Sequence, residues 1–235
     1  MNNPRLQAEL DWWRGWLSPA TLPRLLGVYG MRYLPFWFMD FQDLGRVCDI
    51  GSGPISAAWI AVKFDHLICV DPNARDYRPI LDLMDMTEDE ATDWYNSWKT
   101  LLADPFIVPI LYGGGSLLGK RLALDQTLLP DSGDLEVASF DTVLCLNTLD
   151  HVEDPLAVLK ECHRLLHPSG KLLLWTHLRD EDPGDGLHVA LNAAQVHQLA
   201  AEAGLVHRRS QTGYCETQFG GDPVGDPAFW GTFTR

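Results

Sequence analysis

The first part of the chain carries apolar residues at helical spacing. Four of them lie three or four positions apart: Leu6, Leu10, Trp13 and Leu17. This spacing predicts a helix that ends before Pro19. Thr21 is a suitable N-cap for a second short helix, which Gly27 would end. We therefore expect residues 1–44 to form an aromatic-rich helical cap.

From residue 46 onward, short apolar runs alternate with amphipathic segments. The runs predict strands at 46–50, 66–70, 122–124, 142–146 and 171–175. The amphipathic segments predict helices at 55–63, 155–166 and 192–203. Two last strands, 205–214 and 228–234, have no helix between them and predict an antiparallel hairpin. The expected fold is α/β: a doubly wound, mostly parallel, seven-stranded sheet with this hairpin at one edge.

Residues 72–118 form an insertion between the second and third predicted strands. The segment is far longer than the roughly 20 residues that one helix and two short loops require. It is richer in acidic than in basic residues, and Thr87 followed by Glu90 is a capping-box pattern that predicts a helix near 88–103. We expect this insertion to cover one end of the sheet as a helical lid.

The net charge of the chain limits the classes of partner that it can bind. The 235 residues include 18 Lys and Arg against 32 Asp and Glu, a net charge of −14. Such an acidic chain is a poor match for nucleic acid or an anionic membrane surface, which need clustered basic residues. Small neutral or cationic molecules remain compatible partners.

The five cysteines and the lengths of the apolar runs indicate the cellular compartment in which we expect the protein. The cysteine spacing contains no C-x-x-C pair, and most of the cysteines stand in apolar runs. We therefore expect buried free thiols and a reducing environment. The sequence shows neither a signal-peptide pattern nor an apolar stretch long enough to span a membrane, which favours a cytoplasmic location.

A glycine turn after the first strand is the main candidate for ligand chemistry. Residues 47–54 read Val-Cys-Asp-Ile-Gly-Ser-Gly-Pro, so Gly51 and Gly53 directly follow the strand. Glycines allow a ligand to lie close to the main chain. Asp49 stands at the carboxyl end of the strand, the end at which open α/β sheets bind ligands.

Two kinds of cofactor compete for this turn. A dinucleotide favours a third glycine where this chain has Ser56, and Asp49 would lie beside its phosphates. A cationic ligand without phosphate fits an acidic turn better. S-adenosylmethionine is such a ligand, because its sulfonium is positive and its amino group needs an acceptor.

Taken in order, the motifs resemble those of class I S-adenosylmethionine-dependent methyltransferases. Residues 49–54 are similar to the first motif of this superfamily, and Asp71 ends the second strand where the superfamily has an acidic residue. The runs Phe-Asp-Thr-Val at 140–143, Leu-Asp-His-Val-Glu-Asp-Pro at 149–155 and Leu-His-Pro-Ser-Gly at 166–170 resemble later motifs. The resemblance implies a Rossmann-like domain over residues 45–235.

The resemblance also implies a cofactor site. The expected cofactor-binding residues are Asp49, Gly51, Ser52, Gly53, Asp71, Pro72, Asp125, Gln126 and Asn147. Asp49 and the glycine backbone would hold the methionine part of S-adenosylmethionine, Asp71 the ribose, and Asp125 the edge of the adenine.

His151 is the candidate catalytic residue. A histidine in the loop after the fourth strand can act as a general base on a hydroxyl or an amine. It can equally pack beside the methionine part of the cofactor. His177 and His188 are weaker candidates. Because the histidines and cysteines show no zinc-ligand spacing, we expect no metal site.

The expected reaction is methyl transfer to an oxygen or nitrogen of a small molecule. The sequence has no Asn/Asp-Pro-Pro-Tyr/Phe motif, which in the superfamily marks amino methylation of adenine or glutamine, and no Pro-Cys nucleophile for cytosine C5. Three tryptophans, Trp12, Trp13 and Trp16, would cap the cofactor, stack on the acceptor, or pack in the core or a homodimer contact. The alternatives are an NAD-dependent oxidoreductase and a non-catalytic scaffold that binds the cofactor.

Overall fold

A computed structural model of the chain describes residues 4–16, 25, 28, 29, 32–37, 39–61, 63–77, 126–181, 184, 188–215 and 225–235. The chain forms two compact units. The first contains residues 1–44 and 52–131, and the second contains residues 45–51 and 132–235. The predicted helices at 21–27 and 88–103 lie wholly or largely outside the described residues. The predicted domain boundaries at 45, 72 and 118 stay predictions.

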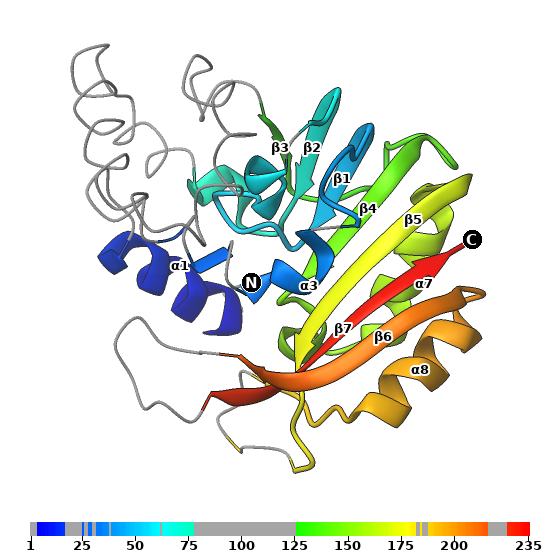
Figure 1. Cartoon of the computed structure of the whole chain (residues 1–235). Helices are drawn as coiled ribbons and strands as arrows, with labels where there is room; N and C mark the ends of the chain where they lie inside the picture. Colours follow the sequence, from blue (N-terminus) through cyan, green and yellow to red (C-terminus); the bar gives the residue numbers. More distant parts are fainter. Residues whose placement is uncertain are drawn as a thin grey trace, which may run out of the picture. The chain divides into compact units, whose positions relative to one another are not determined.

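The described residues of the second unit include five strands. In spatial order they are β1 (Arg46–Ile50), β4 (Phe140–Leu146), β5 (Leu166–His177), β7 (Asp226–Thr234) and β6 (Val206–Cys215). β1, β4 and β5 run parallel, whereas β7 is antiparallel to both of its neighbours (Figure 1). The α/β class and the antiparallel C-terminal hairpin are therefore confirmed.

Two helices of the second unit are α7 (Pro155–Leu165) and α8 (Ala193–Glu202). Their starts follow the sequence closely: Asp154 caps α7 by accepting the Ala157 N–H, and Asn192 with Gln195 forms a capping box on α8. α7 contacts β4 and β5, α8 contacts β6, and the two helices contact each other. They therefore lie side by side on one face of the strands (Figure 1).

The five cysteines are free and buried, as predicted. Three of them, Cys48, Cys145 and Cys162, interact in the second unit. A hydrogen bond with Cys145 and burial raise the pKa of the Cys162 thiol, and burial raises the pKa of the Cys48 thiol. The Cys48 and Cys162 thiols therefore stay protonated and unreactive in the folded protein.

The first unit contains four described elements that bear on the site. They are α1 (Pro4–Trp16), α3 (Leu34–Trp37), β2 (His66–Val70) and β3 (Gln126–Leu129). The predictions of α1 and β2 are confirmed. β2 pairs with β3 in parallel, with Leu67 opposite Gln126 and Val70 opposite Leu129. Whether all seven strands form one sheet stays a prediction, because β2 and β3 belong to this unit.

The helix predicted at 55–63 is wrong in length and type. Only a 3-10 turn, η1 (Ala57–Ile60), forms there. The Ser56 hydroxyl accepts the N–H of Ala58, two residues on, and this closes a turn tighter than that of an α-helix. Ala61 is then extended, and the Lys63 carbonyl accepts the Leu44 N–H.

The strand predicted at 122–124 stays a prediction. These residues lie outside the described part of the chain, whereas β3 covers Gln126–Leu129 and ends before Pro130. β5 is longer than predicted, because it includes the expected turn at 168–170. The register with β4 shifts at this point, from Phe140 opposite Leu166 to Thr142 opposite Lys171, so the residues of the expected turn form an irregularity within β5.

Candidate functional site

In the second unit, a glycine lies tightly against the loop that follows β4. Gly51 has φ +70°, a conformation that L side chains rarely adopt. A Cβ there would overlap the side chain of Thr148, whose hydroxyl donates to the Ile50 carbonyl at 3.0 Å. The sequence analysis attributed this glycine to close approach of a ligand, but the side chain of Thr148 occupies the space on the Cβ side of Gly51. Close packing of the chain therefore explains this glycine, and only the main-chain side of the turn remains as a ligand surface.

Asp49 and Asn147 lie at the carboxyl ends of paired strands in this unit. Asp49 is 2 % exposed and stands opposite Leu144. Asn147 has φ +62° and donates its N–H to the Trp175 carbonyl at 2.8 Å. The Asn147 Oδ1 atom is buried and has no hydrogen-bond partner among the described residues. A buried amide oxygen without a partner is costly, and a ligand donor would satisfy it.

Three side chains beside the same strand ends form a second cluster. Asp150 is fully buried, accepts the Thr176 hydroxyl at 2.9 Å, and has its other carboxylate oxygen 3.7 Å from His151 Nε2. The His151 side chain is 39 % exposed, and its ring lies 4.5 Å from the His188 ring, measured between centroids. The ligand atoms of Asp150, His151 and His188 all lie within 4.8 Å of one another, so this trio could hold a metal ion.

The trio shows what the sequence prediction found and what it missed. His151 and His188 were identified separately, but Asp150 was not, although it directly precedes His151. The Asp-His dipeptide after a strand was an available signal. The sequence expectation of no metal rested on ligand spacing, and that spacing cannot reveal a pair contributed by loops 37 residues apart.

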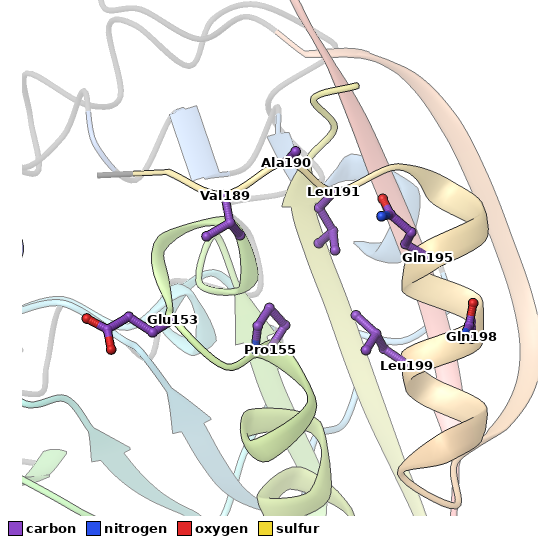
Figure 2. Close-up of a pocket in the computed structure, with 8 residues that line it drawn as sticks. All are labelled: Glu153, Pro155, Val189, Ala190, Leu191, Gln195, Gln198 and Leu199. Atoms are coloured by element: carbon purple, nitrogen blue, oxygen red, sulfur yellow. The ribbon is translucent and has the colours of Figure 1, made fainter. Parts of the chain in front are cut away.

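A pocket of about 320 Å³ lies beside this cluster. Its walls come from the start of α7, the 189–191 segment and α8. Figure 2 shows Pro155, Val189, Leu191 and Leu199 pointing toward one another, with Gln195 and Gln198 on α8. The Val189 N–H donates to the Asp150 carbonyl at 2.8 Å, which joins the pocket wall to the histidine cluster.

In the first unit, Asp71 organises the turn that follows β2. It is 2 % exposed, and its two carboxylate oxygens accept the N–H groups of Gly53, at 3.0 Å, and Asn73, at 2.9 Å. Burial raises the Asp71 pKa, and these hydrogen bonds oppose the rise. Ser52 is buried and bonds the Gly53 carbonyl at 2.8 Å, whereas Pro72 is exposed. The turn therefore brings Ser52, Gly53 and Asp71 together.

The helix α1 packs directly on this turn. Gly53 has φ +60°, and a Cβ there would lie 3.0 Å from the ring of Trp13, which is buried. Trp12 is 49 % exposed and meets Trp13 edge-on. The side chain of Trp16 lies outside the described part of the chain. The structure thus places Trp13 against the turn, as core packing, and leaves Trp12 on the surface.

Of the residues expected near the adenine, only Gln126 lies in the described part of the chain. Gln126 begins β3 opposite Leu67, at the amino end of the strand, whereas Asp71 follows the carboxyl end of β2. Gln126 therefore lies at the wrong end of the strand to join Asp71, and Asp125 lies outside the described residues. His177 is buried against Trp175 and Cys215, which is a packing position.

Known proteins with similar sequences or folds identify the family. A family model described as a methyltransferase domain matches residues 23–215. A ubiquinone biosynthesis O-methyltransferase of Xanthomonas oryzae pv. oryzae is 51 % identical over 41 residues, 17 % of either chain. The chain therefore aligns with only about a sixth of the length of that relative. None of the described helices is long and apolar enough to cross a membrane.

Two solved structures share the fold. A SAM-dependent methyltransferase of Thermotoga maritima has a TM-score of 0.58 and 14 % identity, covering 98 % of this chain and 97 % of that one. The N-methyltransferase NodS of Bradyrhizobium japonicum, solved with S-adenosylhomocysteine, has a TM-score of 0.53 and 17 % identity, covering 98 % and 96 %. These likenesses support the fold, and the family match over residues 23–215 does not favour the dinucleotide alternative. The chain belongs to the methyltransferase-domain family.

Proposed function

We propose that this protein transfers a methyl group from S-adenosylmethionine to an oxygen or nitrogen atom of a small molecule. One observation carries the proposal: in a methyltransferase-domain chain, a buried Asp49 lies near the end of β1, Gly51 and Gly53 follow that strand, and a buried Asp71 follows β2. A cytoplasmic location and a homodimer remain predictions from the sequence.

The residues present fit the cofactor. Bound S-adenosylmethionine supplies a methyl group on a positively charged sulfur. Asp71 has both oxygens held by backbone N–H groups, so it is fixed in place and keeps lone pairs for the ribose hydroxyls. Asp49 supplies negative charge for the cationic end, and the unsatisfied Asn147 Oδ1 supplies an acceptor.

His151 is the proposed general base, and Asp150 is its positioning residue. Asp150 Oδ2 faces the Nε2 atom of His151 at 3.7 Å, a spacing that is loose for a hydrogen bond. Such contacts often tighten only when substrate binds. The carboxylate would orient the ring and stabilise its positive charge, leaving Nδ1 to take the proton of the acceptor. General-base assistance of this kind contributes roughly 10²–10⁴-fold to rate.

The pocket beside the histidines is the proposed site for the apolar body of the acceptor. Val189, Leu191 and Leu199 give it an apolar wall, and the Val189 main chain is bonded to Asp150. Filling the pocket by Leu199→Trp should raise the KM for the acceptor while leaving S-adenosylhomocysteine affinity unchanged. An unchanged KM would remove the pocket from the proposal.

Calorimetry with S-adenosylmethionine and S-adenosylhomocysteine tests cofactor binding. Wild type should bind both, and Asp71→Ala should lose at least tenfold in affinity, because it removes the buried acceptor. Asp76→Ala is the matched control, since Asp76 is an exposed acid on the same turn. Absence of binding to wild type, or equal binding by Asp71→Ala, contradicts the proposal.

Transfer of a radiolabelled methyl group to a panel of phenols, amines and carboxylates then tests the reaction. His151→Gln should lower kcat about 10²-fold or more with unchanged S-adenosylhomocysteine affinity, and Asp150→Asn should lower kcat by less. Cofactor binding without transfer to any acceptor would favour the scaffold alternative instead. Tryptophan quenching by NAD, with none by S-adenosylmethionine, would favour the oxidoreductase.

A further inference from the structure

The helix α1 brings an acidic side chain to the Asp71 turn. The Tyr77 hydroxyl donates to the Glu9 carboxylate at 3.1 Å, and the Trp13 ring N–H donates to the same Glu9 oxygen at 3.4 Å. Tyr77 is fully buried, so the carboxylate of Glu9 is turned inward although the residue is largely exposed. Glu9 is therefore held on the inner side of α1.

A second contact fixes α1 in the same place. The Asn73 side-chain amide donates to the Leu6 carbonyl at 2.9 Å, and Asn73 also donates its main-chain N–H to Asp71. One residue thus ties α1 to the carboxylate that is proposed to bind the ribose. Because α1 is anchored through Asn73 and Tyr77, the position of Glu9 does not depend on Glu9 alone.

The two carboxylates interact electrostatically. Burial, and then the charge of Asp71, raise the pKa of Glu9 to about 7. Tyr77 also forms a hydrogen bond that lowers the pKa of Asp71, so one hydroxyl serves both acids. Two acids placed so close together are unfavourable for the empty protein. Arrangements of this kind concentrate at functional sites, where a ligand satisfies them.

We propose that Glu9 is a second carboxylate of the ribose-binding site, which together with Asp71 accepts hydrogen bonds from the vicinal hydroxyls of the cofactor. This inference rests on the proposed function. A vicinal diol offers two O–H donors, and the Tyr77 and Trp13 bonds both go to Glu9 Oε1, which leaves Oε2 for the ligand. α1 thereby becomes part of the cofactor site through Glu9.

The test compares Glu9→Gln with Asp11→Asn, a neutralised exposed acid on the same helix. The amide oxygen of glutamine can still accept the Tyr77 hydroxyl, so the anchoring of α1 is retained. Glu9→Gln should lose about ten- to hundredfold in S-adenosylhomocysteine affinity, as expected for hydrogen bonds to a charged group, and Asp11→Asn should bind like wild type. The loss should shrink for an S-adenosylhomocysteine analogue that lacks one ribose hydroxyl.

Proton release provides a readout that a structural role would not move. At pH 6, Glu9 is largely protonated in the empty protein, with Asp71 and Tyr77 as the titratable groups that face it. Ribose hydroxyls that donate to Glu9 favour its ionised form, so binding should release up to one proton. Calorimetry in buffers of different ionisation enthalpy measures this release, which Glu9→Gln should abolish.

The outcomes separate this inference from the proposed function. If wild type does not bind S-adenosylhomocysteine, the proposed function itself fails. If wild type binds and Asp71→Ala does not, but Glu9→Gln matches Asp11→Asn in affinity and proton release, then Glu9 only anchors α1 and the inference is overturned.

Discussion

Substitution of Gly51 by alanine tests the packing at the end of β1. Gly51 has φ +70°, and its Cβ position is already occupied by the side chain of Thr148. Alanine there would meet two separate penalties, one from the backbone conformation and one from overlap with the Thr148 hydroxyl and methyl groups.

The two penalties can be estimated separately. A left-handed conformation costs an L-residue roughly 1–2 kcal/mol. Overpacking of a close contact costs roughly 1–3 kcal/mol. Gly51→Ala should therefore reduce the free energy of unfolding by about 2–5 kcal/mol. Gly184→Ala is the control, because Gly184 also has φ +70° but a Cβ there would meet no described atom within 4 Å. Gly184→Ala should therefore lower the free energy of unfolding by the conformational penalty alone.

Urea denaturation of Gly51→Ala, Thr148→Ala, the double variant and Gly184→Ala measures these costs. Thr148→Ala alone should cost about 1 kcal/mol, since it loses the hydrogen bond to the Ile50 carbonyl. In the double variant the overlap is relieved. The loss in its free energy of unfolding should therefore be at least about 1 kcal/mol smaller than the sum of the losses in Gly51→Ala and Thr148→Ala. Additive costs, or equal costs for Gly51→Ala and Gly184→Ala, would refute the steric argument.

Further substitutions and one ligand-removal experiment test other parts of the second unit. Arg164→Ala should lower the free energy of unfolding by about 1–2 kcal/mol, measured in urea, because Arg164 bonds Glu161 and the carbonyls of Ser132 and Leu135. The bond to Arg164 lowers the Glu161 pKa below its ordinary value of 4.5. The stability that this ion pair contributes is therefore present above pH 4.5, and it is lost as the pH falls through the lowered pKa that Glu161 has in the folded protein. Arg164→Ala should flatten that acid limb of the stability profile. Asn192→Ala should cost about 1 kcal/mol through loss of the α8 cap, and an unchanged urea midpoint would contradict it. Dialysis against EDTA should leave methyl transfer unchanged if His151 acts as a base, whereas a loss restored by a divalent cation would make the Asp150 trio a metal centre.

The sequence predicted those elements whose signals are local. The cap residues of α7 and α8, Asp154 and Asn192, act within three residues of their own position. α7 begins at its predicted residue, and α8 begins one residue after its predicted start. The helix at 55–63 failed because one hydroxyl, that of Ser56, closes a tighter turn than apolar spacing can reveal.

The candidate site was predicted by motif and completed by geometry. Asp71 and the glycine turn were found because their residue types follow strand ends in order. Glu9 and Asp150 were missed because each depends on a distant partner, Tyr77 for Glu9 and Thr176 for Asp150. Periodicity marks Glu9 only as a polar position on a helix, and nothing local indicates that α1 turns this carboxylate inward.

Each unit contains at least one buried cysteine whose alkylation rate can report how often that unit opens in the native state. Cys69 lies inside β2 in the first unit, whereas Cys145 and Cys162 lie in the second. Because a buried thiol reacts only after its surroundings open, the alkylation rate of each cysteine reports the opening free energy of its own unit. Peptide mass spectrometry after timed alkylation would resolve these rates without any introduced label. Equal rates would mean that the two units open together in a single cooperative transition.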